Sequence, residues 1–132
     1  MNALAQQLSQ FETAGSYTLT CGVDSLRQAS AQAGLMLFEA DMKGVKGKPK
    51  LLGALARAID CPDTFGANWD ALADVLCDLS WQGATPGYVL LLRNASDTLG
   101  LSVNDREIAQ DLFADTALYW RQRGKPFWIF FA

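Results

Sequence analysis

Residues 17–40 read YTLTCGVDSLRQASAQAGLMLFEA, and their patterning decides the fold class. Residues 17–21 alternate apolar and polar side chains, which predicts a strand, and the apolar run 35–40 predicts a second one. Between them we expect a helix that is capped by Asp24 and ends at Gly34. A strand, a crossover helix and a strand make a βαβ unit with parallel strands. The stretch therefore predicts an α/β protein.

The rest of the chain continues this alternation of helices and strands. Further helices are predicted over residues 1–11, from Pro49 to just before Pro62, from Trp69 to Ser80 behind an Asn68 cap, and from Asn104 to Arg123. Further strands are predicted over 88–93 (YVLLLR) and 127–131 (FWIFF). This order predicts a two-layer α/β fold in which helices pack on a small parallel sheet of three to four strands.

Length and composition place limits on the class of protein. A chain of 132 residues is long enough for one core, so we expect residues 1–132 to form a single domain. Its longest apolar runs are far shorter than the ~20 residues of a membrane-spanning helix. The first residues resemble no secretory signal. We therefore expect a cytoplasmic protein that does not enter a membrane.

The sequence lacks the residues on which several kinds of catalytic, metal and phosphate-binding sites depend. The chain has no histidine, which removes the commonest general base and the commonest metal ligand. Its three cysteines form no C-x-x-C pair, and the basic loop at residues 43–50 lacks the spacing of a phosphate-binding loop. A net charge of −3 disfavours nucleic acid and favours basic proteins. We expect no cofactor, no metal and no enzymatic activity.

Residues 63–81, DTFGANWDALADVLCDLSW, contain a stripe of acids. Asp70, Asp74 and Asp78 recur every four residues, which on a helix aligns three carboxylates on the face opposite the apolar side chains. Neighbouring like charges destabilise a helix by a few tenths of a kcal/mol per pair. The stripe therefore suggests a function outside folding.

Physical reasoning leaves two interpretations of this stripe open. A merely solvated surface accounts for Asp70, which complements the dipole in the first turn, but explains Asp74 and Asp78 poorly. The second interpretation, a paired-carboxylate hydrolase or magnesium site, lacks a nucleophile, a third ligand and a concave pocket.

The same segment resembles a known family. The pattern P-x-x-F-G-x-N-W-D-A-L-x-D-x-L at residues 62–76, followed by the strand YVLLL and a last helix and strand, resembles barstar, the intracellular inhibitor of barnase, and its relatives. The resemblance covers residues 35–132, and residues 1–34 are expected to be an N-terminal extension that packs on this core. It implies a ribonuclease inhibitor with a small parallel sheet packed by helices.

The resemblance also implies a binding site on the helix of the motif and the loop before it. In the family that the motif resembles, the aspartates of this helix take the place of RNA phosphates in the active site of a basic ribonuclease. Carried over to this chain, the partner-binding residues are Asp70, Asp74, Asn68, Thr64, Phe65, Gly66, Asp78 and Trp81. The alternative is a protein-interaction module of the same fold whose target is not a nuclease.

Two departures from the family pattern concern this predicted contact. Thr64 and Ala73 stand where barstar has aromatic residues, so the aromatic part of the contact is reduced. A further acid of the family falls at Tyr119 when positions are counted back from Gly124. The target nuclease is therefore not expected to be a close copy of barnase.

Overall fold

Five α-helices and four β-strands alternate along the chain in the computed structural model, which describes residues 2–62 and 67–132. In chain order the elements are α1 (Ala3–Leu8), β1 (Ser16–Thr18), α2 (Val23–Gln32), β2 (Met36–Asp41), α3 (Lys48–Ala58), α4 (Trp69–Leu76), a 3₁₀ turn (Ser80–Gln82), β3 (Tyr88–Arg93), α5 (Val103–Arg121) and β4 (Phe127–Phe131).

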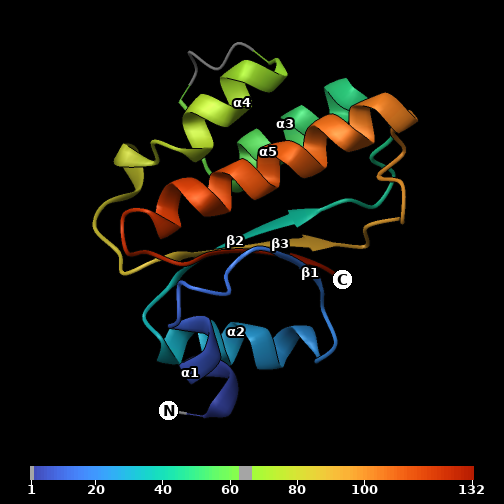
Figure 1. Ribbon diagram of the computed structural model, residues 1–132. Helices are drawn as coiled ribbons and strands as arrows, with labels where there is room; N and C mark the ends of the chain where they lie inside the picture. The colour runs from blue at the N-terminus through green and yellow to red at the C-terminus, as the bar shows by residue number, and fades with distance from the viewer. Residues whose placement is uncertain (1, 63–66) are drawn as a thin grey trace.

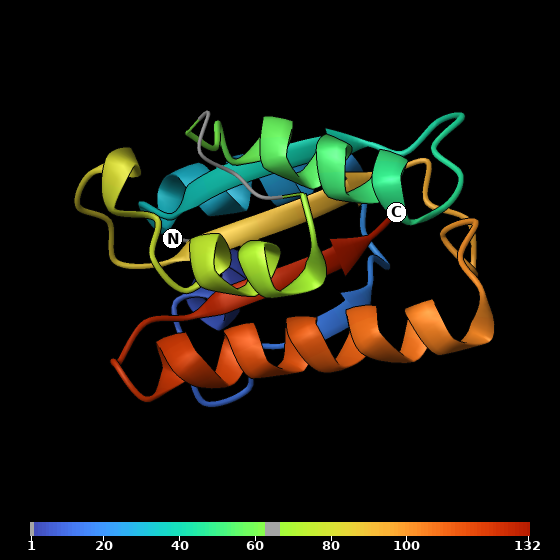
Figure 2. The same cartoon turned by 90° about the horizontal axis from the view of Figure 1, so that it is seen from above.

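All four strands belong to one parallel sheet, in the order β1-β4-β3-β2. Helices α3, α4 and α5 cover one face of the sheet, and α1 and α2 lie against the other (Figure 1). Viewed from above, α4 lies beside α5, on the same face of the sheet as α3 (Figure 2). The predicted α/β class with a small parallel sheet packed by helices is confirmed.

The two central strands carry the core because they are covered on both faces. Every residue of β3 except Arg93 is buried, and every residue of β4 except Phe131. Leu90 and Ile129 face the α3–α5 side, whereas Val89 and Trp128 face α1 and α2. Near-continuous apolar strands of this kind are what a parallel sheet requires.

The N-terminal βαβ unit differs from the prediction in the extent of its first strand and in the N-cap of its helix. Its strands are parallel, but β1 and β2 are the two edges of the sheet, with β4 and β3 between them. The first strand covers only Ser16–Thr18, because its ladder partner β4 ends at Phe131, opposite Thr18. Gly22, rather than Asp24, is the N-cap of α2, and Asp24 lies in the first turn.

The predicted ends of two other helices are also corrected. The helix predicted to run to Ser80 ends at Leu76, after which Leu79 adopts a left-handed conformation with φ 53°. Asp78 therefore lies beyond α4 and not on it. The last helix begins one residue before the predicted Asn104, because the side chain of Ser102 accepts a hydrogen bond from the Asp105 N–H and makes Ser102 the N-cap.

Candidate protein-binding site

Helix α4 begins at a well-formed cap. The Asn68 Oδ1 atom accepts a hydrogen bond of 2.7 Å from the Ala71 N–H, which satisfies one of the free donors at the helix start. Asp70 lies in the first turn, where its charge complements the helix dipole. The residue before the cap, Ala67, has a φ of 52°. This left-handed conformation costs a residue other than glycine about 1 kcal/mol or more. The entry to α4 is therefore sharply defined.

The inner side of α4 is anchored in the core. Leu72 and Leu76 are completely buried against the α3–α5 side of the sheet. At the end of the helix, the Trp120 indole nitrogen on α5 donates a hydrogen bond of 2.8 Å to the Leu76 carbonyl oxygen. At its start, the half-buried Trp69 ring packs against the same core, and the Lys48 Nζ atom lies 5.8 Å from its centroid. The helix is held at both ends.

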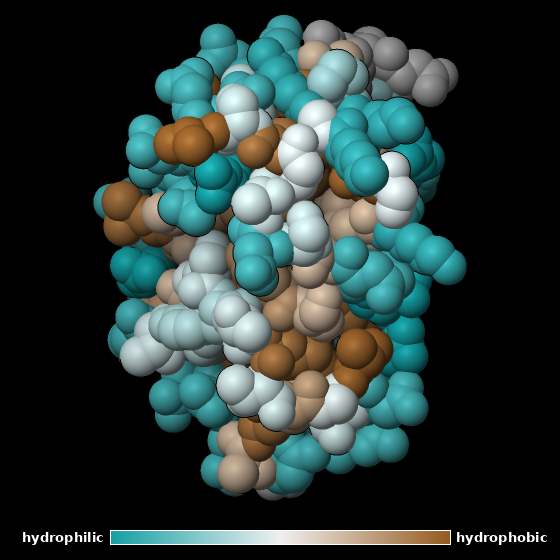
Figure 3. Space-filling view, turned by 90° about the vertical axis from the view of Figure 1, so that its right-hand side faces the viewer, coloured by the Kyte–Doolittle hydropathy of each residue, from teal (hydrophilic) through white to brown (hydrophobic). Residues whose placement is uncertain are grey.

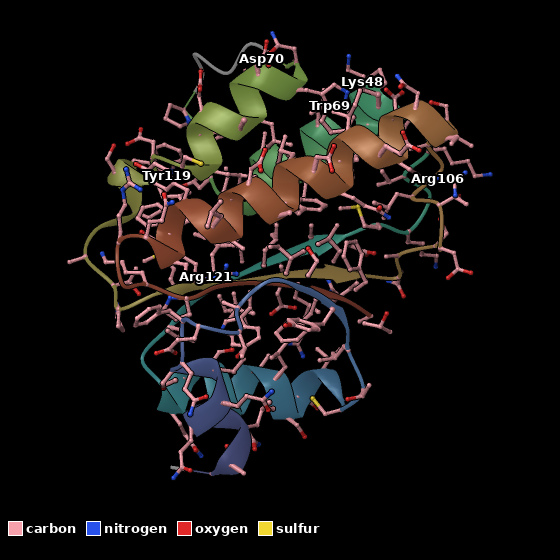
Figure 4. The ribbon with its side chains drawn as sticks, viewed as in Figure 1. Lys48, Trp69, Asp70, Arg106, Tyr119 and Arg121 are labelled. Atoms are coloured by element: carbon pink, nitrogen blue, oxygen red, sulfur yellow. The ribbon has the colours of Figure 1, made fainter. Side chains whose placement is uncertain are left out.

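The outer side of α4 presents two carboxylates to solvent. Asp70 and Asp74 are exposed and lie one turn apart on the helix. Figure 4 shows Asp70 at the end of α4 that is farthest from the sheet. Among the described residues, neither forms an ion pair; the ion pairs found there join Arg27 and Arg93 to Asp24 and Glu39. These carboxylates are thus open to a cationic partner.

Asp78 has different surroundings from the other two acids. It follows the end of α4, where its Oδ2 atom accepts a hydrogen bond of 3.2 Å from the Ser80 hydroxyl. Burial raises the pKa of the Tyr88 phenol, and the nearby negative charge of Asp78 raises that pKa further. Asp78 is exposed, but it belongs to the turn after the helix, so the three acids do not form one helical stripe.

An acid on α5 joins this region, and the sequence analysis missed it. Burial raises the pKa of the Cys77 thiol, and the charges of Asp74 and Asp115 add to this increase, whereas the Thr116 hydrogen bond and Arg123 oppose it. Asp74 and Asp115 therefore lie near the same thiol, one from each helix. Glu107, Asp111 and Asp115 repeat every four residues in the sequence, the same spacing as the first stripe, and that repeat was the available signal.

The aromatic residue predicted to contact the partner, Trp81, is tied into the fold. Its indole nitrogen donates a hydrogen bond of 2.9 Å to the Ile59 carbonyl oxygen at the end of α3, and the Gln82 amide donates to the same oxygen. Its ring is half-buried against the core. Of the other predicted contacts, Thr64, Phe65 and Gly66 lie outside the described residues.

Asp70 and Asp74 line none of four cavities formed by described residues. In residues 2–62 and 67–132, no three potential ligands of the His, Cys, Asp and Glu types come together as a metal site would require. Within the same ranges no helix has the length and apolarity to span a membrane.

Comparison with known proteins identifies the family. A family model described as Barstar (barnase inhibitor) matches residues 35–132. The chain belongs to the Barstar family. The family expected from the motif at residues 62–76 is confirmed, and α4 with its two exposed acids lies within the matched range. The Barstar family is one of inhibitors rather than enzymes. A comparison with curated proteins finds no match.

Proposed function

We propose that this chain inhibits a basic ribonuclease by placing Asp70 and Asp74 among the phosphate-binding cations of the enzyme's active site. The observation that carries the proposal is the pair of exposed carboxylates, without an ion pair among the described residues, on the outer side of an anchored helix. A free protein gains no stability from this arrangement. A partner with clustered Arg and Lys side chains would gain charge-assisted hydrogen bonds from it.

The anchoring of α4 supports this function. The Asn68 cap and the Trp120 hydrogen bond hold the helix in one position before any partner arrives. Little conformational freedom is then lost on binding, so more of the interaction energy contributes to affinity. The net charge of −3 further favours encounter with a basic enzyme.

Asp115 extends the proposed contact from α4 to α5. Its side chain is exposed, and its negative charge raises the pKa of the Cys77 thiol, as that of Asp74 does. A cation placed between the two helices could therefore interact with both Asp74 and Asp115. The Tyr119 ring, one turn further along α5, is covered by the Arg123 guanidinium at 3.4 Å from its centroid, so the chain's own cation occupies that ring.

The proposal is tested by ribonuclease inhibition. The full chain is titrated into barnase and into basic ribonucleases recovered with it from its native host, and RNA cleavage is followed with a fluorogenic substrate. The Asp70→Asn/Asp74→Asn variant is compared with Glu12→Gln/Asp24→Asn, which also removes two exposed acids but leaves α4 and α5 unchanged. We expect wild type and control to inhibit a ribonuclease, and the α4 variant to inhibit it at least about a hundredfold more weakly.

Two results would contradict the proposal. One is equal inhibition by the α4 variant and its control, because the acids on α4 would then not be the contact. The other is recovery of a stoichiometric partner that is not a nuclease and whose binding depends on Asp70 and Asp74, which would establish an interaction module with a different target.

A further inference from the structure

A second candidate site lies at the carboxyl ends of the strands, and none of its lining residues belongs to α4. A cavity of about 410 Å³ is formed by the end of β1, the end of β4, the segment after β3 and the first half of α5. Its polar lining residues are Thr18, Ser96, Asp97, Arg106 and Gln110, and its apolar lining includes Phe113 and Phe131. Cavities of this size accommodate small molecules.

The position of the cavity follows from the topology of the sheet. The chain leaves β1 toward the face covered by α2, and it leaves β3 toward the face covered by α5 (Figure 1). These connections diverge at the carboxyl ends of the strands, which is where open α/β sheets form their ligand crevices. Figure 3 shows this edge of the molecule, where hydrophobic and near-neutral atoms reach the surface in a band between hydrophilic ones.

Arg106 gives the cavity its chemical character. The Arg106 Nε atom is buried, yet it has no hydrogen-bond partner among the described residues. The guanidinium forms no ion pair there either, although Asp97 borders the same cavity. A buried donor without a partner destabilises the folded protein, and an ion or ligand that accepts its hydrogen bond removes that cost.

The other polar groups of the lining are also available. The side chains of Ser96, Gln110 and Thr18 are exposed, and none makes a hydrogen bond within the described residues. Together with Arg106 they supply donors suited to an oxyanion, next to one acid of the lining, Asp97, while the Phe113 and Phe131 rings offer an apolar wall. A few convergent polar groups above an apolar wall are typical of a ligand site.

We propose that this cavity binds a small molecule that carries an oxyanion, a carboxylate or a phosphate, on an apolar body. Arg106 holds the oxyanion through its Nε and terminal N–H groups, Ser96 and Gln110 add hydrogen bonds, and the body lies against Phe113 and Phe131. The site is separate from α4 and requires no nuclease.

The test uses the full-length chain labelled with ¹⁵N and three probes of similar size: benzoate, phenyl phosphate and the neutral benzamide. We expect benzoate or phenyl phosphate to shift the amide signals of residues 95–99 and 106–110 in a saturable manner. Benzamide should bind at least about tenfold more weakly, since it lacks the charge. Whichever of the two anions binds more tightly indicates whether the natural ligand carries a carboxylate or a phosphate.

Variants assign the binding to Arg106. Arg106→Gln should lower the affinity for the more tightly bound anion at least about tenfold. Arg106→Lys keeps the charge but not the planar fork of the guanidinium, so its affinity should be intermediate. Arg57→Gln is the matched control, because it removes an exposed arginine on α3 that does not border the cavity. All three variants should inhibit ribonuclease as wild type does. Saturable binding that is equal in Arg106→Gln and wild type, or absent with both anions, would overturn the proposal.

Discussion

The indole nitrogen of Trp120 donates a buried hydrogen bond of 2.8 Å to the carbonyl oxygen of Leu76, 44 residues earlier in the chain. Leu76 is the last residue of α4, and its carbonyl has no successor in the helix to bond with. One side chain of α5 thus completes the end of the helix that carries Asp70 and Asp74. The bond links the core of the protein to the geometry of its proposed binding face.

Replacing Trp120 by Phe should show how much this hydrogen bond contributes to the stability of the fold. The substitution keeps an aromatic ring but leaves the buried Leu76 carbonyl without its donor, which costs about 1–3 kcal/mol, and the smaller ring adds a cavity. Urea denaturation should report a loss of that size or somewhat more. Leu118→Ala, which shortens an exposed side chain of the same helix, is the control and should change the stability little. Equal stability of Trp120→Phe and wild type would contradict this role.

The end of α4 shows where sequence reasoning is weakest. Apolar spacing through Leu79 is consistent with a helix that continues to Ser80, and Leu79 is indeed buried. However, Leu79 reaches the core from a left-handed conformation after the helix has ended, rather than from a continuation of the helix. The Trp120 hydrogen bond also lies at this end, and a contact between distant residues is not visible in a local pattern. Periodicity therefore predicted which residue is buried, but not the conformation that buries it.

The order of the strands was similarly beyond local reasoning. A βαβ pattern specifies that its strands are parallel, and this was correct for β1 and β2. It does not specify whether other strands insert between them. Here β3 and β4 do so, because they carry the most continuous apolar sequences and are stable only when covered on both faces. The exposed positions of Asp70 and Asp74 on α4 could be predicted because Asn68 and the helix start are local signals, whereas the effect of Asp115 on Cys77 depends on the packing of α4 against α5.

Asn68 should contribute to stability as well as to the binding face. Asn68→Ala removes the oxygen that accepts from the Ala71 N–H and should cost about 1 kcal/mol. Asn68→Asp keeps an acceptor at the same position and should be close to wild type in stability. Thermal unfolding of the three proteins at neutral pH provides the comparison. A loss of equal size in both variants would mean that the cap is not the source of the effect.

Glu39 should make the stability depend on pH. The pKa of Glu39 is lowered from its ordinary value of 4.5, first by hydrogen bonds from Arg27 and then by the charges of Arg27 and Arg93. A carboxyl group with a lower pKa in the folded state stabilises the protein above its unfolded pKa, and this contribution is lost as the pH falls through the folded value. Glu39→Gln should therefore be less stable than wild type at pH 7 and approach wild type well below pH 4.5. A constant difference across this range, measured by urea denaturation, would exclude Glu39 as the titrating group.

The N-terminal segment should be required for stability, as expected for a single domain over residues 1–132. Trp128 in β4 donates a buried hydrogen bond of 2.8 Å to the Leu8 carbonyl oxygen, and Arg121 donates to the carbonyl oxygens of Phe11 and Ala14. Deleting residues 1–22 removes these contacts and exposes the apolar face of β4. The melting temperature should fall by roughly 10 °C or more.

A milder variant separates this contact from general damage by truncation. Arg121→Gln leaves the chain complete but loses the hydrogen bonds to the loop between α1 and β1, so its melting temperature should lie between those of wild type and the deletion. An unchanged melting temperature after deletion of residues 1–22 would show that the segment is an appendage and not part of the domain.

The last prediction separates function from folding at Asp74. If Asp74 contacts buried cations of a nuclease, Asp74→Ala should weaken binding by about 2–5 kcal/mol, because it leaves those cations unpaired. Asp70→Ala should have a similar or smaller effect. Asp78 lies in the turn after α4, so Asp78→Ala should mainly lower the association rate and its dependence on salt. The free protein should lose at most about 1 kcal/mol in any of the three variants, since no ion pair among the described residues involves these acids and the helix-dipole effect of Asp70 and the exposed Ser80–Asp78 hydrogen bond are both weak.

Two measurements on each variant decide the matter: the melting temperature of the free protein, and the affinity and association rate for the target ribonuclease by surface plasmon resonance at two salt concentrations. Glu12→Gln serves as the control for a change of one charge at an exposed position outside the site. The combination expected for Asp74→Ala is an unchanged or slightly higher melting temperature with a large loss of affinity, because the substitution also relieves repulsion from Asp70 one turn away. The reverse combination, a melting temperature lower by many degrees with intact affinity, would mean that Asp74 serves the fold, and the outer side of α4 would then not be the inhibitory face.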